Sequence, residues 1–380
     1  VFLIPALMCT ATLILSCWID LYNLSVMVLG IVLYTVIYCA LNWILMMNYY
    51  EKNLIREPLI RLTGKMKRNK KAGKEMKDSK LKRKLVAAYE VFYEARRMAV
   101  LRTKYHLRIM SPERTLRYIK KHQCSIARFG DGEFDIICST RDLHFQTRNE
   151  KLAAKLSAVL ETKDKRLLLC VPRCFNTTRG CNAHSKTFWI EWGKRDNHHQ
   201  QIINLIRAHT GPQYLFGDSQ ITRPYIDWVD SKRAERTFPM LKALWAGRDV
   251  LIVEGEQTRL GVGNDLYDDA ASIKRILAPA VGAFEHYDEI KQAILDNYHG
   301  ELIIMALGPT ATVLAADLAA MDMQALDIGN TDIEYEWFRN GAKERIAIPG
   351  KFTNEATGGR EVADCQDKKY LSQIIARIGC

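Results

Sequence analysis

The first 47 residues contain no lysine or arginine, and Asp20 is their only acidic residue. So little charge excludes a solvated surface segment, and residues 24–47 suffice to cross a bilayer, which takes about 20 apolar residues. No basic region precedes the first apolar run, which argues against a cleaved signal peptide. We therefore predict transmembrane segments in residues 1–50, as two helices. Because the first residue is Val1 and not Met, we expect the chain to begin inside a longer protein.

Three common binding motifs are also missing from the sequence. There is no Walker A lysine motif, and no Cys-x-x-Cys pair occurs among the ten cysteines. The four residues Cys170, Cys174, Cys181 and His184 match none of the usual zinc-finger spacings. The segment from Gly261 to Leu266 begins like a dinucleotide fingerprint but lacks its third glycine, which argues against NAD. A P-loop ATPase, a zinc finger and an NAD enzyme are therefore disfavoured.

Aromatic residues are absent from residues 65–84, within a strongly basic stretch. Residues 51–84 contain 14 Lys and Arg against four Asp and Glu, and account for most of the net charge of +12. Without aromatic side chains on which bases could stack, this stretch does not favour nucleic acid. Basic residues directly after an apolar span are typical of the cytoplasmic side of a membrane. We predict a basic juxtamembrane linker or helical stalk over 51–110 and a catalytic domain facing the cytoplasm over 111–380.

Residues 111–380 alternate between short apolar runs and helical patterns. Short apolar runs of this kind are typical of strands buried on both faces, and the helices between them indicate a mostly parallel sheet. The predicted fold is α/β and Rossmann-like, with helices on both faces of the sheet. Strands are expected at 125–129, 167–171, 249–254, 302–307 and 325–328. Helices are expected at 112–121, 149–160, 202–209, 238–245, 270–277, 287–297 and 310–321.

An Asp-x-Glu pair follows the first of these strands. Asp131 and Glu133 flank Gly132, and Gly130 precedes them, at the carboxyl end of a predicted strand. Oxygen ligands so spaced suit Mg²⁺ or Mn²⁺, which keep positions open for water and phosphate. A simple polar turn is the alternative, because Gly and Asp are common turn residues.

Other predicted strand ends carry glycines together with acids, hydroxyls or arginine. Gly308, Pro309 and Thr310 stand at a strand-to-helix junction, where backbone N–H groups can bind a phosphate; an ordinary capped helix is the alternative. Arg223 and Arg259 are candidate phosphate clamps, or else surface salt-bridge partners. In parallel sheets, ligands bind at the carboxyl ends of the strands.

Four motifs occur in the order that characterises a known bacterial family. They are Arg128-Phe129-Gly130-Asp131-Gly132-Glu133-Phe134, then Glu254-Gly255 with Arg259-Leu260-Gly261-Val262-Gly263-Asn264-Asp265-Leu266, then Ala306-Leu307-Gly308-Pro309-Thr310-Ala311-Thr312, then Asp327-Ile328-Gly329 with Asp332-Ile333-Glu334-Tyr335-Glu336-Trp337. The sequence from about residue 111 to 355 resembles the GT-D fold glycosyltransferases, a family first described as a domain of unknown function. Members often carry His where this chain has Asn330.

The resemblance implies a metal-dependent hexosyltransferase that uses a nucleotide-sugar donor, typically UDP-activated. Mn²⁺ or Mg²⁺ would be held by Asp131 and Glu133, and the catalytic base would be one of Glu254, Asp327, Asp332 and Glu334. The donor would contact Arg128, Gly130, Asp131, Arg223, Arg259, Gly261, Gly263, Asn264, Gly308, Pro309 and Thr310.

We expect this enzyme in the inner membrane of a bacterium, in surface-glycan synthesis. Its acceptor would be a glycan, a lipid-linked oligosaccharide or a protein. Two alternatives stay open: a non-catalytic nucleotide-binding membrane module of a glycan-assembly complex, and a metal-dependent nucleotide-sugar phosphohydrolase. The sequence leaves open the donor sugar, the stereochemistry and the oligomeric state.

Overall fold

The structure is a computed structural model that describes residues 35, 106–138, 146, 149–194 and 198–379. The residues from His106 onward belong to one compact unit, Val91–Cys380. The transmembrane segments predicted in residues 1–50 and nearly all of the predicted linker lie outside the described residues. In the part of the chain that is described, no helix has both the length and the apolar composition that a membrane crossing requires.

The described elements alternate between strands and helices along the chain. The strands are β1 (Arg108–Ile109), β2 (Ser125–Arg128), β3 (Leu167–Val171), β4 (Leu215–Asp218), β5 (Asp249–Gly255), β6 (Ser272–Ala278), β7 (Leu302–Ala306), β8 (Ala325–Asp327) and β9 (Ile374–Arg377). The helices are α5 (Pro112–His122), α6 (Asp131–Ile137), α7 (Glu150–Glu161), α8 (Ala183–Lys194), α9 (His198–Thr210), α10 (Lys232–Trp245), α11 (Tyr287–Asn297), α12 (Pro309–Ala320), α13 (Thr331–Arg339) and α14 (Lys368–Gln373), with short 3₁₀ turns η1 (Arg173–Phe175), η3 (Ser219–Thr222) and η4 (Ala283–His286).

The described strands form one sheet in the order β1-β4-β3-β2-β8-β7-β5-β6-β9, and each paired strand is parallel to its neighbour. The predicted mostly parallel α/β sheet is therefore confirmed. From β2 the chain continues toward β3, and from β8 toward β9, in opposite directions along the sheet. The carboxyl ends of β2 and β8 thus form a topological switch point, where open α/β sheets bind ligands.

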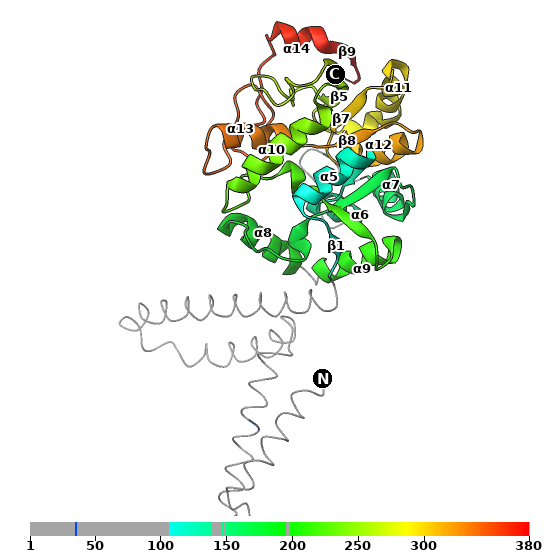
Figure 1. The fold of residues 1–380 in the computed structure, drawn as a ribbon, viewed down its shortest axis with the longest axis vertical. Helices are drawn as coiled ribbons and strands as arrows, with labels where there is room; N and C mark the ends of the chain where they lie inside the picture. The colour runs from blue at the N-terminus through cyan, green and yellow to red at the C-terminus, as the bar shows by residue number, and fades with distance from the viewer. Residues whose placement is uncertain (1–34, 36–105, 139–145, 147–148, 195–197, 380) are drawn as a thin grey trace, which may run out of the picture. The chain divides into compact units, whose positions relative to one another are not determined.

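Two hydrophobic cores cover the two faces of the sheet, because successive strand residues point to opposite faces. On β2, Ala127 faces the core shared with α7, α9, α11 and α12, and Ile126 faces the core shared with α5 and α10. Leu169 and Leu168 divide in the same way on β3. Figure 1 shows α11 and α12 on one side of the strands and α10 on the other. Helices on both faces were predicted, and the structure confirms them.

One predicted element has a different secondary structure, and one helix was not predicted. Residues 270–277 were expected to be helical, but residues 272–278 form β6 and pair with β5 over seven positions and with β9 on the other side. The helix-forming Ala, Lys, Arg and Leu of this segment are overruled by pairing within the sheet. No helix is among the predicted elements after residue 328, whereas the structure has α13 there, so that Asp332 and Glu334 lie in the first turn of a helix.

Candidate active site at the carboxyl ends of the strands

The Asp-x-Glu motif lies in the first turn of α6, directly after β2. The helix begins at Asp131, and the preceding Gly130 is extended (φ −121°, ψ −163°). Positions 131 and 133 are therefore about 200° apart around a helix axis, and not neighbours in an extended turn. Glu133 turns back toward the helix start, because its Oε2 accepts a hydrogen bond of 2.7 Å from the backbone N–H of Gly130. Its carboxylate is thereby held at the N-terminal end of α6, where Asp131 is also located.

A charged clamp joins the end of β2 to the end of β8. The Arg128 guanidinium donates to Asp327 Oδ1 at 2.9 Å and to the Asp327 backbone oxygen at 2.7 Å. Its Nη1 also donates to Thr222 Oγ1 of η3 at 2.6 Å. Asp327 Oδ2 accepts from the Arg128 backbone N–H at 3.1 Å and from Thr312 of α12 at 3.1 Å. Arg128 and Asp327 therefore fix the geometry of the switch point, and both Asp327 oxygens have internal partners.

The two carboxylates of the motif fit a hard divalent cation by charge and by donor type. Burial and the nearby Asp327 carboxylate raise the pKa of Glu133 to about 7, although Gly130 and Arg128 oppose this shift. A cation beside this carboxyl would favour its ionised form. No group of three or more His, Cys, Asp or Glu in the described residues is arranged to hold a metal. The protein would thus supply two carboxylates and leave the other positions to water and phosphate oxygens, as Mg²⁺ commonly requires.

The N-terminus of α12 faces the same switch point. Gly308 precedes the helix with φ 56° and ψ −142°, a conformation that favours glycine, and Pro309 occupies the first turn. Thr310 is fully buried, and its Oγ1 has no hydrogen-bond partner in the described residues. Thr312 Oγ1 lies 3.0 Å from the Arg128 backbone oxygen. The phosphate-binding role predicted for Gly308, Pro309 and Thr310 remains a prediction, and their position beside β2 is compatible with it.

Glu254, at the end of β5, is buried and fully paired. Its Oε1 accepts from Arg275 Nη1 at 2.6 Å, and its Oε2 accepts from the Leu260 backbone N–H at 2.7 Å. Burial raises the pKa of Glu254, whereas Arg275 lowers it. Among the four acids predicted as catalytic bases, Glu254 is therefore placed to hold the loop after β5 against β6. This geometry favours a structural role for it.

Asp332 connects this loop to α13. Its Oδ1 accepts from the Gly261 backbone N–H and from Asn264 Nδ2, both at 2.8 Å. Its Oδ2 is paired with buried Lys351, and Glu336 accepts from Asn264 at 2.7 Å. Asp332 and Asn264 thus have protein partners. Lys351, 19 residues after Asp332, was not predicted as a site residue, because it follows no strand.

Gly261 and Gly263 form a matched pair of test positions in this loop, since their φ angles are 76° and 78°. A Cβ at Gly261 would lie 2.7 Å from Tyr267 Cδ2, whereas a Cβ at Gly263 would meet nothing within 4 Å. We expect Gly263→Ala to cost roughly 1–2 kcal/mol through backbone strain alone. Gly261→Ala should cost clearly more, because Tyr267 must also move. Urea unfolding of both variants measures this, and equal losses would contradict the described contact.

Glu334 differs from the other three acids. Its Oε2 accepts from the backbone N–H groups of Tyr225 and Ile226 at 3.0 and 3.1 Å, whereas its Oε1 is buried without a hydrogen-bond partner in the described residues. Burial raises the pKa of Glu334 to about 8; Arg223 opposes this shift and Asp227 adds to it. Of the four predicted bases, only Glu334 combines a carboxyl oxygen that lacks a hydrogen-bond partner in the described residues with a pKa raised to about 8. The catalytic role of all four remains a prediction.

The raised pKa of Glu334 makes a prediction about stability. In the unfolded chain a Glu titrates near 4.3, so between about pH 4.3 and 8 the folded state retains a proton that the unfolded state loses. The contribution of this carboxyl group to the free energy of unfolding is fully present below the pKa of the unfolded chain and is lost as the pH rises toward 8. We expect Glu334→Gln to lose less stability than the wild type between pH 5 and 8, as measured by urea unfolding. Parallel pH profiles would show that Glu334 is ionised in the folded protein.

The two arginines predicted as phosphate clamps already bind protein groups. Arg259 (φ 54°) donates to the backbone oxygens of Gly350 and Ala363 at 2.8 and 2.6 Å. Arg223 donates twice to Glu355, at 2.5 and 2.7 Å, and once to Asp227, at 3.1 Å.

Arg345 and Glu355 were not predicted as site residues. Arg345 donates to Glu355 at 2.8 Å and to Asp227 at 2.5 Å. Burial alone would raise the pKa of Glu355, but Arg223 and Arg345 lower it to about 2. Asn330 also donates to Glu355, at 2.9 Å. Neither Arg345 nor Glu355 follows a predicted strand, so the strand-end pattern did not point to this network.

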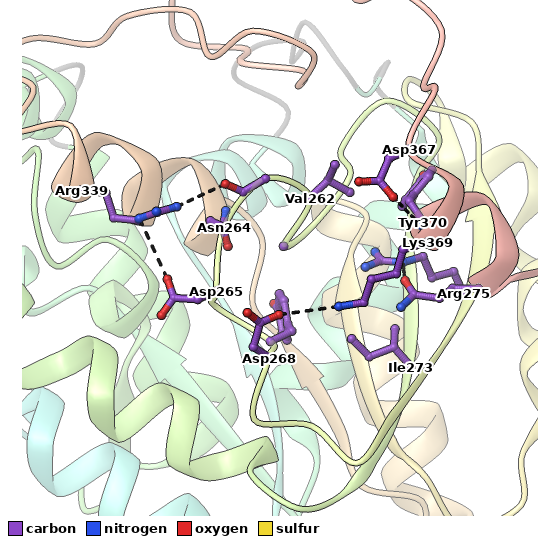
Figure 2. A pocket seen from close by; sticks show the side chains of 14 residues that line it. Val262, Asn264, Asp265, Asp268, Ile273, Arg275, Arg339, Asp367, Lys369 and Tyr370 are labelled. Carbon is purple, nitrogen blue, oxygen red and sulfur yellow. Dashed lines mark hydrogen bonds and ion pairs between the residues drawn. The ribbon is translucent and has the colours of Figure 1, made fainter.

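A cavity of about 390 Å³ lies beside the loop of residues 261–268, against β6 and α14. Figure 2 shows Arg339, Asn264 and Asp265 on one side and Lys369, Tyr370 and Asp367 on the other. Gly261 and Gly263 belong to its wall, but Asp131 and Glu133 do not. Of the residues predicted to contact the donor, Gly261, Gly263 and Asn264 therefore line this cavity, whereas Arg128 and Gly130 lie at the switch point.

Comparison with known proteins identifies the family. Residues 126–356 match the family described as glycosyltransferase GT-D fold. The chain is 36% identical over 273 residues to "Glycosyltransferase GlyD" of Streptococcus pneumoniae serotype 4 (strain ATCC BAA-334 / TIGR4), and 37% identical over 271 residues to "Probable glycosyl transferase Gly" of Streptococcus gordonii. These matches cover 72% and 71% of this chain, but the chain spans only 33% and 39% of the length of those proteins.

Solved structures agree with this assignment. A structure of domain of unknown function 1792, described as having a distinct glycosyltransferase fold, is 38% identical with a TM-score of 0.68, and the match covers 75% of this chain and all of that one. A glycosyltransferase of the same domain type from Streptococcus sanguinis is 35% identical with a TM-score of 0.66, over 72% of this chain and all of that one. With the family match spanning more than half of the sequence, the chain belongs to the GT-D fold glycosyltransferase family.

Proposed function

We propose that this chain is a membrane-anchored, metal-dependent glycosyltransferase that transfers a sugar from a UDP-activated donor to a glycan, lipid-linked or protein acceptor. The observation that carries the proposal is the position of Asp131 and Glu133 at the switch point, beside the Arg128–Asp327 clamp and the N-terminus of α12. Here the carboxyl ends of β2, β7 and β8 come together. In a parallel sheet this edge receives the ligand.

The chemistry assigns distinct tasks to these groups. Asp131 and Glu133 would hold Mn²⁺ or Mg²⁺, which when bound neutralises charge on the diphosphate leaving group. The backbone N–H groups of the residues that follow Pro309 in the first turn of α12 face the switch point and can bind phosphate oxygens. Arg128 keeps β2 and β8 in register through Asp327. For deprotonating the acceptor hydroxyl we favour Glu334, because among the four predicted acids it alone has a carboxyl oxygen, Oε1, without a hydrogen-bond partner in the described residues.

The proposed location is the inner membrane of a bacterium, with the catalytic domain in the cytoplasm. Its support is the apolar composition of residues 1–47 and the basic stretch after it. A role in surface-glycan synthesis follows from placing a glycosyltransferase where lipid-linked acceptors are found. Both statements rest on the sequence, because these residues lie outside the described part.

One contact favours a second candidate, a nucleotide-binding module without turnover. The Asn330 amide is bound to Glu355, at a position where the family resemblance leads us to expect His. An amide cannot act as a general acid or base at neutral pH, as an imidazole can. If that position must titrate for catalysis, this chain would bind a donor without transferring its sugar.

The test uses the full chain in mild detergent with a panel of nucleotide sugars, in Mn²⁺ or in EDTA. We expect metal-dependent release of UDP from one donor. Release of sugar phosphate in its place would support a nucleotide-sugar phosphohydrolase. Binding of UDP without turnover of any donor, even with cell-membrane extract as acceptor, would support the non-catalytic module. Absence of both binding and turnover would contradict the proposal.

A further inference from the structure

Two buried cysteines face each other beyond the end of β3. The Sγ atoms of Cys174 and Cys181 are 3.5 Å apart, and the two residues are 1% and 7% exposed. Cys174 lies in η1, directly after β3, and Cys181 lies shortly before α8. Among the described residues, no group of three or more His, Cys, Asp or Glu is arranged to hold a metal. The two thiols therefore form a pair with each other and do not belong to a larger cluster of ligands.

The geometry of this pair allows a disulfide bond. The sulfurs of a disulfide are about 2.05 Å apart, so that these two must approach by roughly 1.5 Å. The backbone of Cys181 is held in an antiparallel bridge with Trp228. The loop of residues 176–180 between the two cysteines can follow the movement, because Arg179 and Gly180 are exposed. Rotation of the two side chains and a small shift of this loop are therefore enough to close the bond.

Cys181 is the thiol that is better suited to react first. Its hydrogen bond with Cys174 lowers the pKa of Cys181, although burial opposes this shift. Burial raises the pKa of Cys174 well above its ordinary value. The thiolate is the reactive form of cysteine, and the chain around Cys181 is exposed at Gly180 and Ala183. A molecule as small as a peroxide can therefore approach Cys181, with Cys174 in position to react next.

Cys174 also connects the pair to the switch point. Its thiol donates to Gln220 Oε1 of η3 at 3.3 Å, and Gln220 is 4% exposed. Two further residues of η3, Ser219 and Thr222, accept from the Arg128 guanidinium at 3.5 and 2.6 Å. A disulfide sulfur carries no proton, so oxidation removes this donor from a buried carbonyl oxygen, which is costly. Oxidation of the pair is therefore expected to destabilise η3, on which Arg128 rests.

We propose that Cys174 and Cys181 form a reversible disulfide when the protein meets a peroxide, and that this disulfide loosens η3 at the switch point. The Cys181 thiolate attacks one oxygen of hydrogen peroxide and breaks the O–O bond, which gives a sulfenic acid and one water. The Cys174 sulfur then attacks the sulfenic sulfur, whose oxygen leaves as a second water. The two thiols thus lose two electrons and two protons, which the peroxide takes up. A dithiol such as dithiothreitol reverses the bond by thiol–disulfide exchange.

Peptide mapping of the full chain in mild detergent tests the disulfide. Trypsin cleaves after residues 173, 179 and 186, so that the bond would join the peptides 174–179 and 180–186. The protein is treated with hydrogen peroxide, and its remaining thiols are blocked with N-ethylmaleimide before digestion. We expect the linked peptides to appear, and dithiothreitol to remove them. Recovery of Cys181 as a free thiol or as a sulfinic acid, without linked peptides, would overturn the inference.

Two variants test the link to the switch point. Cys174→Ser cannot form the disulfide but keeps a hydroxyl that can donate to Gln220. Cys365→Ser is the control, because Cys365 is more exposed than either member of the pair. We expect peroxide to speed hydrogen–deuterium exchange of peptides covering η3 in the wild type and in Cys365→Ser, but not in Cys174→Ser. Equal exchange in all three treated proteins would overturn the loosening of η3.

The rate of UDP release gives a second readout of the same variants. We expect peroxide to slow it about threefold to tenfold in the wild type and in Cys365→Ser, the size of one lost hydrogen bond, and to leave Cys174→Ser unchanged. This readout rests on the proposed function, whereas the linked peptides and the exchange do not. If the untreated protein releases no UDP but peroxide still produces the linked peptides and faster exchange, the proposed function fails and the inference stands.

Discussion

An Asp131→Asn/Glu133→Gln variant should release UDP from the donor roughly 10²–10³-fold more slowly than the wild type, the scale found when an enzyme loses one electrostatic stabiliser of its transition state. The two amides conserve the size of the side chains but remove both negative charges at the start of α6. Glu133→Gln can still accept the Gly130 hydrogen bond through its amide oxygen. The expected loss is therefore a loss of cation binding and not of structure. Initial rates of UDP release over a range of Mn²⁺ concentrations measure it.

Glu150→Gln is the matched control for this variant. Glu150 is also an acid in the first turn of a helix, α7, but it is exposed and belongs to no predicted site. Its rate should be that of the wild type. A double variant that keeps its rate and its Mn²⁺ dependence would show that Asp131 and Glu133 hold no catalytic metal.

Arg275→Met should have the largest effect on folding, a loss of about 3–5 kcal/mol of unfolding free energy. The guanidinium is 3% exposed and pairs with Glu254, which is fully buried. It also donates to the Leu260 backbone oxygen at 2.8 Å. Without Arg275, the carboxylate of Glu254 is left in the interior with one backbone N–H as its partner. Urea unfolding at pH 7, with the chain kept in mild detergent, measures the change.

Two controls separate charge burial from lost packing. Lys274→Met removes the neighbouring pair with Glu301, at 3.0 Å, in which the lysine is 41% exposed, and should cost at most about 1 kcal/mol. Glu254→Gln/Arg275→Met removes the stranded charge and should recover part of the loss. If the double variant is no more stable than Arg275→Met, the burial of an unpaired carboxylate is not the cause.

The fold could be predicted from local patterns because buried parallel strands are continuous apolar runs. The runs before Asp131, Gly308 and Gly329 each end at the carboxyl edge of the sheet, as expected. β6 was mistaken for a helix because its sequence mixes good helix formers with two isoleucines, and its conformation is decided by β5 and β9. The sequence of residues 272–278 does not indicate that this segment will pair with β5 and β9.

The candidate site was predictable only in part, for a related reason. Asp131 and Glu133 are adjacent in sequence to the strand that positions them, so their place followed from the strand. For Arg223 and Arg259 the choice between a phosphate clamp and a salt-bridge partner stayed open, because their partners Glu355 and Gly350 are about 90 to 130 residues away. Burial and pairing over such distances decide whether a polar residue binds a ligand or the protein itself.

The assignment of Asp131 and Glu133 as metal ligands is tested most directly by titrating Mn²⁺ into the full chain, in the presence and absence of UDP. Free Mn²⁺ is measured by electron paramagnetic resonance. We expect one bound Mn²⁺ whose affinity increases with UDP, because protein carboxylates and diphosphate oxygens would share the ion. Asp131→Asn/Glu133→Gln should abolish this site, and Glu150→Gln should retain it. Equal Mn²⁺ binding by the wild type and the double variant would contradict the assignment of Asp131 and Glu133 as the metal ligands.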